Sequence, residues 1–216
     1  MIRAVLWDND GVLVDTEALY FDATREVLAS VGAELTRDLF VRISLEEGRS
    51  AFDLARERGT TEDEVKRLRS RRDERYSEFL RLGVPVFDGA EEVLSRLHGR
   101  VRMGVVTSAH REHFDLIHRS TGLVRYFEFV LAREDYESSK PHPDPYLAAL
   151  ERHGLRAEES MVIEDSVRGL LAARVAGIRC IVVPNALTRQ GRFDGAHAVV
   201  GNLREAETEL ERLLSE

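Results

Sequence analysis

Two aspartates lie two residues apart in Asp8-Asn9-Asp10-Gly11, directly after a short apolar run. The run, Ile2–Trp7, has the length and composition of a buried strand. In an open parallel sheet, ligands bind beyond the carboxyl ends of the strands, so both carboxylates would face a ligand crevice. One could stay ionised and attack, while the other holds a proton to donate. The alternative is an ordinary loop with a helix-capping aspartate, which a lone D-x-D pattern does not exclude.

A second acidic pair, Glu164-Asp165, directly follows the apolar run Met161–Ile163. Two acidic side chains at the end of another strand repel each other unless a cation lies between them. Carboxylate oxygens are hard ligands of the kind that Mg²⁺ prefers. Asp165 could instead cap a helix that begins near Val167, but a cap leaves Glu164 unexplained.

Two further polar positions could bind or balance an anion. Thr107-Ser108 follows the run Val101–Val106, and a hydroxyl with the N–H groups of a strand-to-helix turn can hold an anion, although such residues are also common N-caps. Lys140 precedes Pro141, which restricts its backbone to extended conformations. It could balance negative charge near the acidic residues, or it could be an ordinary surface lysine.

Short apolar runs alternate with helical patterns along most of the chain, which favours an α/β fold with a doubly wound parallel sheet. The predicted strands are Ile2–Trp7, Val101–Val106, Phe127–Leu131, Met161–Ile163 and Arg179–Val183. The predicted helices between them are Ala90–Leu97, His110–Ser120, Asp144–His153 and Val167–Ala176, each followed closely by a glycine that can end a helix.

The segment between Asp15 and about Pro85 contains helical patterns and no strand pattern. The predicted helices are Glu17–Ser30, Arg37–Glu46, Ser50–Arg58 and Thr61–Leu82. We therefore expect a core domain of residues 1–15 and 86–216, with an all-helical cap domain of residues 16–85 inserted after the first strand. The stretch Lys66–Arg75 holds six basic residues in ten, which predicts a solvated helix face or an arginine that binds an anionic substrate.

Composition excludes several classes of protein. The 216 residues are 43% hydrophobic and 32% charged, which is typical of a globular protein. The net charge of −8 argues against binding nucleic acid by phosphate neutralisation. The single cysteine, Cys180, lies in an apolar run and predicts a buried core residue rather than a disulfide framework. No run reaches the ~20 apolar residues of a membrane span, and the N-terminal apolar stretch is too short for a signal peptide. We expect a cytoplasmic protein.

The order of these chemical groups along the chain resembles the haloacid dehalogenase superfamily. The four motifs of that superfamily read here as WDNDGVLVDTE, VVTS, KPHPDPY and VIEDSVRGLLAARVAG, and they span nearly the whole chain. The resemblance implies a Rossmann-like core with a four-helix cap of the β-phosphoglucomutase-like subfamily. It also implies Mg²⁺ as the cofactor.

The resemblance assigns roles to the residues that match the motifs. Asp8 would be the nucleophile and a metal ligand, and Asp10 would be the general acid and base, with its backbone carbonyl on the metal. Thr107, with the Ser108 amide, would hold the phosphoryl oxygens. Lys140 would orient the nucleophile and offset charge.

Asp165 would ligate Mg²⁺ directly in this scheme, and Glu164 would do so directly or through water. Dehalogenases and phosphonatases resemble the chain but lack the second aspartate, so Asp10 favours phosphoryl transfer from oxygen. An alkoxide leaving group needs a proton, and a transferring phosphoryl group needs cations around its oxygens. The expected activity is that of a monomeric phosphatase acting on a small phosphorylated metabolite through an aspartyl phosphate on Asp8.

A phosphomutase is the nearest alternative. The mutases resemble the chain in Thr16 and in a basic cap residue that matches Arg72, but they carry a histidine where this chain has Tyr20. They also carry a substrate-binding arginine after a Gly-x-Ser turn, where Ala51 follows Gly48-Arg49-Ser50 here. These departures favour a phosphatase.

The expected substrate-binding residues are Ser108, Thr16, Tyr20, Arg49 and Arg72.

Two other classes of protein share parts of the pattern. A response-regulator receiver domain is much shorter, and its acidic pair comes before the phosphorylated aspartate rather than last. A catalytically silent regulatory relative is the other alternative, and the presence of every catalytic residue type favours an enzyme.

Overall fold

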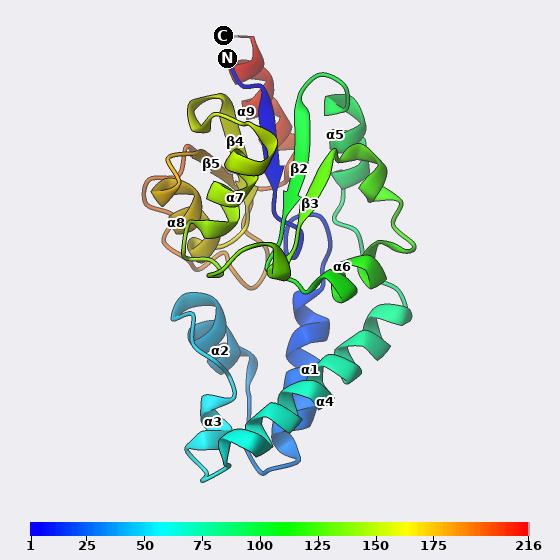
Figure 1. Cartoon of the computed structure of the whole chain (residues 1–216), viewed down its shortest axis with the longest axis vertical. Coiled ribbons are helices and arrows are strands. Elements are labelled where there is room, and N and C mark those ends of the chain that lie inside the picture. The colour runs from blue at the N-terminus through cyan, green and yellow to red at the C-terminus, as the bar shows by residue number, and fades with distance from the viewer. Residues whose placement is uncertain (216) are drawn as a thin grey trace.

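A six-stranded parallel sheet organises the larger part of the protein (Figure 1). The computed structural model describes residues 1–215, apart from the side chains of Leu45 and Glu46. The strand order is β3-β2-β1-β4-β5-β6. Their bounds are β1 (Ala4–Trp7), β2 (Arg102–Val106), β3 (Phe129–Leu131), β4 (Ser160–Glu164), β5 (Arg179–Val182) and β6 (Ala198–Val199).

Helices cover both faces of the sheet because successive strand residues point to opposite faces and both sets are apolar. One face packs on α5 (Ala90–Leu97), α6 (Arg111–His118) and α9 (Leu203–Leu214), and the other on α7 (Asp144–His153) and α8 (Val167–Val175). Short 3₁₀ turns complete the connections at η2 (Leu123–Tyr126), η3 (Arg133–Asp135) and η4 (Ala157–Glu159). The prediction of a doubly wound α/β fold is confirmed.

A separate helical unit lies beyond the end of the sheet toward which the strands run (Figure 1). It consists of α1 (Glu17–Ala29), α2 (Arg37–Phe40), the π-helix η1 (Val41–Glu46), α3 (Asp53–Arg56) and α4 (Glu62–Arg81). It has its own apolar cluster, centred on Leu28, Leu35 and Ala55. The unit touches the core where α4 packs on α6 and where η1 packs on α8.

The structure differs from the predicted elements in three places. The predicted helix Arg37–Glu46 changes from α to π geometry after Phe40, and the predicted helix Ser50–Arg58 shortens to four residues. The edge strand β6 and the helix α9 have no counterpart among the predicted elements, and β6 is only two residues long. None of the described helices combines the length and the apolar composition that a membrane span requires.

Candidate active site

The register of the sheet brings the two acidic motifs together. Trp7 lies opposite Ile163 in the β1–β4 pair, so Asp8 and Glu164 follow at neighbouring strand ends. The Asp8 backbone N–H donates to the Ile163 carbonyl at 2.9 Å, which extends the strand pairing by one step. Asp8, Glu164 and Asp165 are all buried, and each offers a carboxylate oxygen within 4.8 Å of the others. Residues 156 positions apart thus form one acidic cluster.

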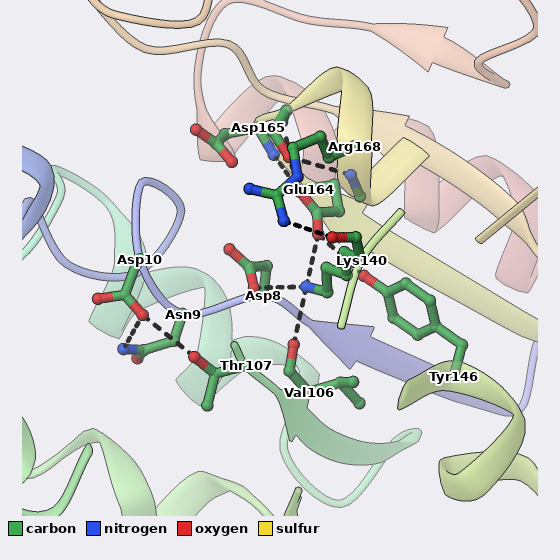
Figure 2. A network of polar contacts seen from close by, with 12 residues as sticks. Asp8, Asn9, Asp10, Val106, Thr107, Lys140, Tyr146, Glu164, Asp165 and Arg168 are labelled. Atoms are coloured by element: carbon green, nitrogen blue, oxygen red, sulfur yellow. Dashed lines mark hydrogen bonds and ion pairs between the residues drawn. The ribbon is translucent and has the colours of Figure 1, made fainter. Parts of the chain in front are cut away.

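Lys140 lies at the centre of this cluster (Figure 2). Its Nζ donates to Asp8 Oδ1 at 2.6 Å, to Glu164 Oε1 at 2.6 Å and to the Val106 carbonyl at 3.0 Å. Burial alone would lower the pKa of Lys140, but the two carboxylates outweigh burial and raise its pKa well above the ordinary value. The ammonium therefore stays charged and fixes the direction of the Asp8 carboxylate.

Glu164 has both carboxylate oxygens occupied by protein donors. Oε1 accepts from Lys140 and from the Tyr146 hydroxyl at 3.0 Å, while Oε2 accepts from the Asp165 N–H at 3.1 Å and from Ser166. Burial would raise the pKa of Glu164, but Lys140 outweighs burial and lowers it. A Cβ at Gly169, in the first turn of α8, would overlap the Glu164 carboxyl group, so the absence of a side chain there makes room for it.

Asp8 and Asp165 retain unpaired carboxylate oxygens. Among the described side chains and backbone groups, no donor reaches Asp8 Oδ2 or Asp165 Oδ1, whereas Asn185 Nδ2 donates to Asp165 Oδ2 at 2.8 Å. Burial raises the pKa of Asp8 to about 8 despite the opposing charge of Lys140. Burial, Glu17 and Glu164 raise the pKa of Asp165 well above its ordinary value.

Both shifts come first from burial, which disfavours the charged form, and then from neighbouring carboxylates whose charge one ammonium does not balance. A divalent cation between Asp8 and Asp165 would supply the missing positive charge, and carboxylate oxygens are the ligands that Mg²⁺ prefers. The donor set therefore fits Mg²⁺.

Asp10 lies apart from Lys140 and is held by three donors (Figure 2). Thr16 donates to Oδ1, while Thr107 at 3.1 Å and the Asn9 amide at 3.2 Å donate to Oδ2. Gly11 makes the turn possible, because its φ is +88° and a Cβ there would lie 2.5 Å from an Asp165 oxygen. The Asp10 carboxylate is outside the cluster of Asp8, Glu164 and Asp165 and accepts no bond from Lys140.

The strand end after β2 places the two predicted anion-binding residues beside Asp8. Thr107 is buried, and its Oγ accepts from the Ala109 N–H at 3.0 Å, so this hydroxyl has its hydrogen available to donate. The Tyr136 hydroxyl donates to the Thr107 carbonyl at 2.8 Å and fixes the turn. Ser108, the next residue, is exposed.

The predicted substrate-binding residues of the helical unit divide into two groups. Tyr20 and Arg72 contact each other, because an Arg72 nitrogen donates to the Tyr20 hydroxyl and the guanidinium lies 4.4 Å from the ring centroid. Arg49 is exposed and pairs with Glu47 at 3.1 Å and Asp53 at 3.5 Å. The structure places no contact between Arg49 and the acidic cluster.

Three residues of the site, Tyr146, Arg168 and Asn185, are not among the predicted site residues. Tyr146 lies on α7 and reaches the cluster only through the fold, as does Asn185 beyond β5. Arg168 on α8 joins the core to the helical unit, since it donates to the Lys140 carbonyl and, at 3.2 Å, to the Ser44 carbonyl of η1. Tyr146 and Arg168 stand in the motifs KPHPDPY and VIEDSVRGLLAARVAG, and Asn185 follows the predicted strand Arg179–Val183 by two residues, so each had a signal that could have identified it.

Asn9 is fully buried between the two aspartates and contacts His118 of α6. The middle residue of D-x-D gives no sign of this contact, and His118 lies in an otherwise ordinary amphipathic helix.

Comparisons with known proteins agree with this arrangement. The family model for haloacid dehalogenase-like hydrolases matches residues 5–183. A phosphorylated carbohydrates phosphatase of Thermotoga maritima is 35% identical over 83% of this chain and 84% of its own length. A phosphoglycolate phosphatase of Photorhabdus laumondii is 29% identical over 83% of this chain and 79% of its own.

A solved structure extends the comparison to the fold. CbbY of Rhodobacter sphaeroides, as a variant in complex with xylulose 1,5-bisphosphate, superposes with a TM-score of 0.82 at 26% identity, covering 95% of this chain and 96% of that one. The match includes both the sheet and the helical unit. This chain belongs to the haloacid dehalogenase-like hydrolase family.

Proposed function

We propose that the protein is a Mg²⁺-dependent phosphatase that hydrolyses a small phosphomonoester through an aspartyl phosphate on Asp8. The general class, phosphoric monoester hydrolase, follows from the family and from the phosphatases among its relatives. The observation that carries the finer proposal is the buried cluster of Asp8, Glu164 and Asp165 around Lys140, which leaves one oxygen of Asp8 unpaired.

Asp8 would attack the phosphorus in line with the leaving oxygen, while Lys140 holds its other oxygen at 2.6 Å. The Thr107 hydroxyl and the Ser108 N–H would hold the phosphoryl oxygens. Asp10 would protonate the leaving alcohol and then take a proton from the water that hydrolyses the aspartyl phosphate. The two proton transfers balance, so Asp10 returns to its starting state.

Mg²⁺, when bound, would supply positive charge that stabilises the phosphoryl oxygens. The Asp8 and Asp165 carboxylates and the Asp10 backbone carbonyl would hold it. Glu164 would act through water and as the counter-charge of Lys140, because both of its oxygens already accept hydrogen bonds from the protein.

Residues 16–85 would form the cap that covers the substrate, on a core of residues 1–15 and 86–216. The last residue, Glu216, lies outside the described residues. Tyr20 and Arg72 are proposed to contact the part of the substrate away from the phosphate, with Thr16 near the leaving group. Arg49 would need a different arrangement of the cap to reach a substrate. The relatives that act on phosphorylated carbohydrates and bind xylulose 1,5-bisphosphate favour a sugar phosphate.

The test is phosphate release from a panel of phosphorylated metabolites with Mg²⁺, using the wild type and Asp8→Asn. We expect release by the wild type and none above background by Asp8→Asn, because an amide is a poor nucleophile. Asp63→Asn changes an exposed aspartate in the first turn of α4 and is the matched control. Wild-type turnover by Asp8→Asn would refute the role of Asp8. Conversion of β-glucose 1-phosphate to glucose 6-phosphate, in place of phosphate release, would favour a phosphomutase.

A further inference from the structure

A buried chain of hydrogen bonds leads from α6 to Asp10. Thr121 Oγ lies 2.7 Å from His118 Nδ1, and His118 Nε2 lies 2.7 Å from Asn9 Oδ1. Asn9 Nδ2 then donates to Asp10 Oδ2 at 3.2 Å. Asn9 and His118 are buried, so water does not compete with these bonds. The chain therefore reaches Asp10 through buried residues.

The acceptor at one end fixes the direction of every bond. An ionised carboxylate only accepts, so the Asn9 amide nitrogen must face Asp10 and its oxygen must face His118. The Asn9 oxygen needs a donor, so the proton of the neutral imidazole lies on Nε2, and Nδ1 accepts from the Thr121 hydroxyl. Burial lowers the pKa of His118 to about 4, which agrees with a neutral ring. Every polar atom of the chain is satisfied in this one arrangement.

We propose that His118 is a positioning residue for the general acid and base, acting through the Asn9 amide on Asp10. This inference rests on the proposed function, in which Asp10 transfers the proton. The Thr107 hydroxyl also donates to Asp10 Oδ2, but it is the group proposed to turn toward the phosphoryl oxygens. Asn9 is then the remaining donor to Oδ2 among the described residues, and His118 holds its amide in the orientation that donates.

A matched pair of probes separates proton transfer from the rest of the reaction. p-Nitrophenyl phosphate releases a phenolate that leaves without a proton, whereas p-nitrobenzyl phosphate differs by one methylene and releases an alkoxide that needs one. kcat/KM reports the steps up to the release of the alcohol. A variant that loses the hydrogen bond from Asn9 to Asp10 should therefore have a lower kcat/KM for the benzyl ester and an unchanged kcat/KM for the phenyl ester.

The variants are His118→Leu, which removes the donor, and His118→Gln, whose amide nitrogen can replace Nε2. One hydrogen bond predicts a roughly three- to tenfold loss of kcat/KM for the benzyl ester in His118→Leu, recovered in His118→Gln. His153→Leu, which changes a histidine stacked on Phe129 away from the site, is the control and should retain both values. If His118→Leu fails to fold, Asn9→Ala tests the same chain from its other end.

A double mutant tests whether the effect passes through Asp10. In an Asp10→Asn background, His118→Leu should cause no further loss with the benzyl ester. An equal loss for both esters, or the same loss in the Asp10→Asn background, would overturn the positioning role. A wild type that hydrolyses neither ester would refute the proposed function instead, so the two failures are distinguishable.

Discussion

Alanine at Gly169 should destabilise the protein, although alanine is the better helix former. Gly169 lies in the first turn of α8, where the substitution would ordinarily stabilise the helix by up to about 1 kcal/mol. The new Cβ would overlap the Glu164 carboxyl group, which has to move. Glu164 is 1% exposed, and its Oε1 lies 2.6 Å from Lys140 Nζ. Breaking a buried ion pair costs about 3–5 kcal/mol, so the net loss should be about 2–4 kcal/mol.

Denaturant unfolding of the wild type and Gly169→Ala measures this loss, and phosphate release should fall with it. Val175→Ala, at an exposed position of the same helix, is the control and should be neutral or slightly stabilising. Glu164→Asp removes one methylene from the crowded side chain, so adding Gly169→Ala to it should cost little more. A Gly169→Ala variant with a higher unfolding midpoint and unchanged activity would refute the argument that this glycine makes room for Glu164.

Three further predictions follow from the same geometry. Mg²⁺ should raise the melting temperature of the wild type in thermal unfolding and have little effect on that of Asp165→Asn. An equal rise in both proteins would contradict cation binding at Asp165. Asp10→Asn should lower kcat/KM for p-nitrobenzyl phosphate by roughly 10²-fold or more and spare p-nitrophenyl phosphate, measured by steady-state kinetics; equal losses would contradict the acid role.

The third concerns the pH dependence of stability. The pKa of His118 is about 4 when folded and 6.5 as the ordinary value, so the unfolded chain takes up the proton first and the free energy of unfolding falls as the pH drops between them. We expect the free energy of unfolding, measured with denaturant, to fall between about pH 7 and about pH 4 by about 3 kcal/mol more in the wild type than in His118→Leu. An equal fall in the two proteins would show that the His118 ring is not buried in its neutral form.

The strand ends and their acidic residues could be predicted from the sequence because each apolar run stops abruptly at a polar residue. Trp7 is followed by Asp8, and Ile163 by Glu164, and parallel pairing then brings both ends to one edge. The local apolar pattern and the parallel pairing of strands were thus enough to predict that these acidic residues lie together. The alternation of short apolar runs and amphipathic helices likewise predicted the doubly wound parallel sheet, while the order of its strands comes from the structure.

The contact between Asn9 and His118 could not be predicted, because it joins residues 109 positions apart and belongs to no periodic pattern. Arg49 is an expected substrate-binding residue, and the sequence does not predict that its side chain pairs with the neighbouring acids Glu47 and Asp53. Such orientations depend on the packing of particular side chains rather than on the spacing of residue types.

The bond between Arg168 and the helical unit has a consequence for how the protein can diversify. Arg168 contacts the main-chain carbonyl of Ser44, and every amino acid carries that carbonyl. Replacing the side chain at position 44 therefore leaves this attachment intact. Substitutions at position 44 can therefore accumulate while this hydrogen bond between α8 and the helical unit is kept.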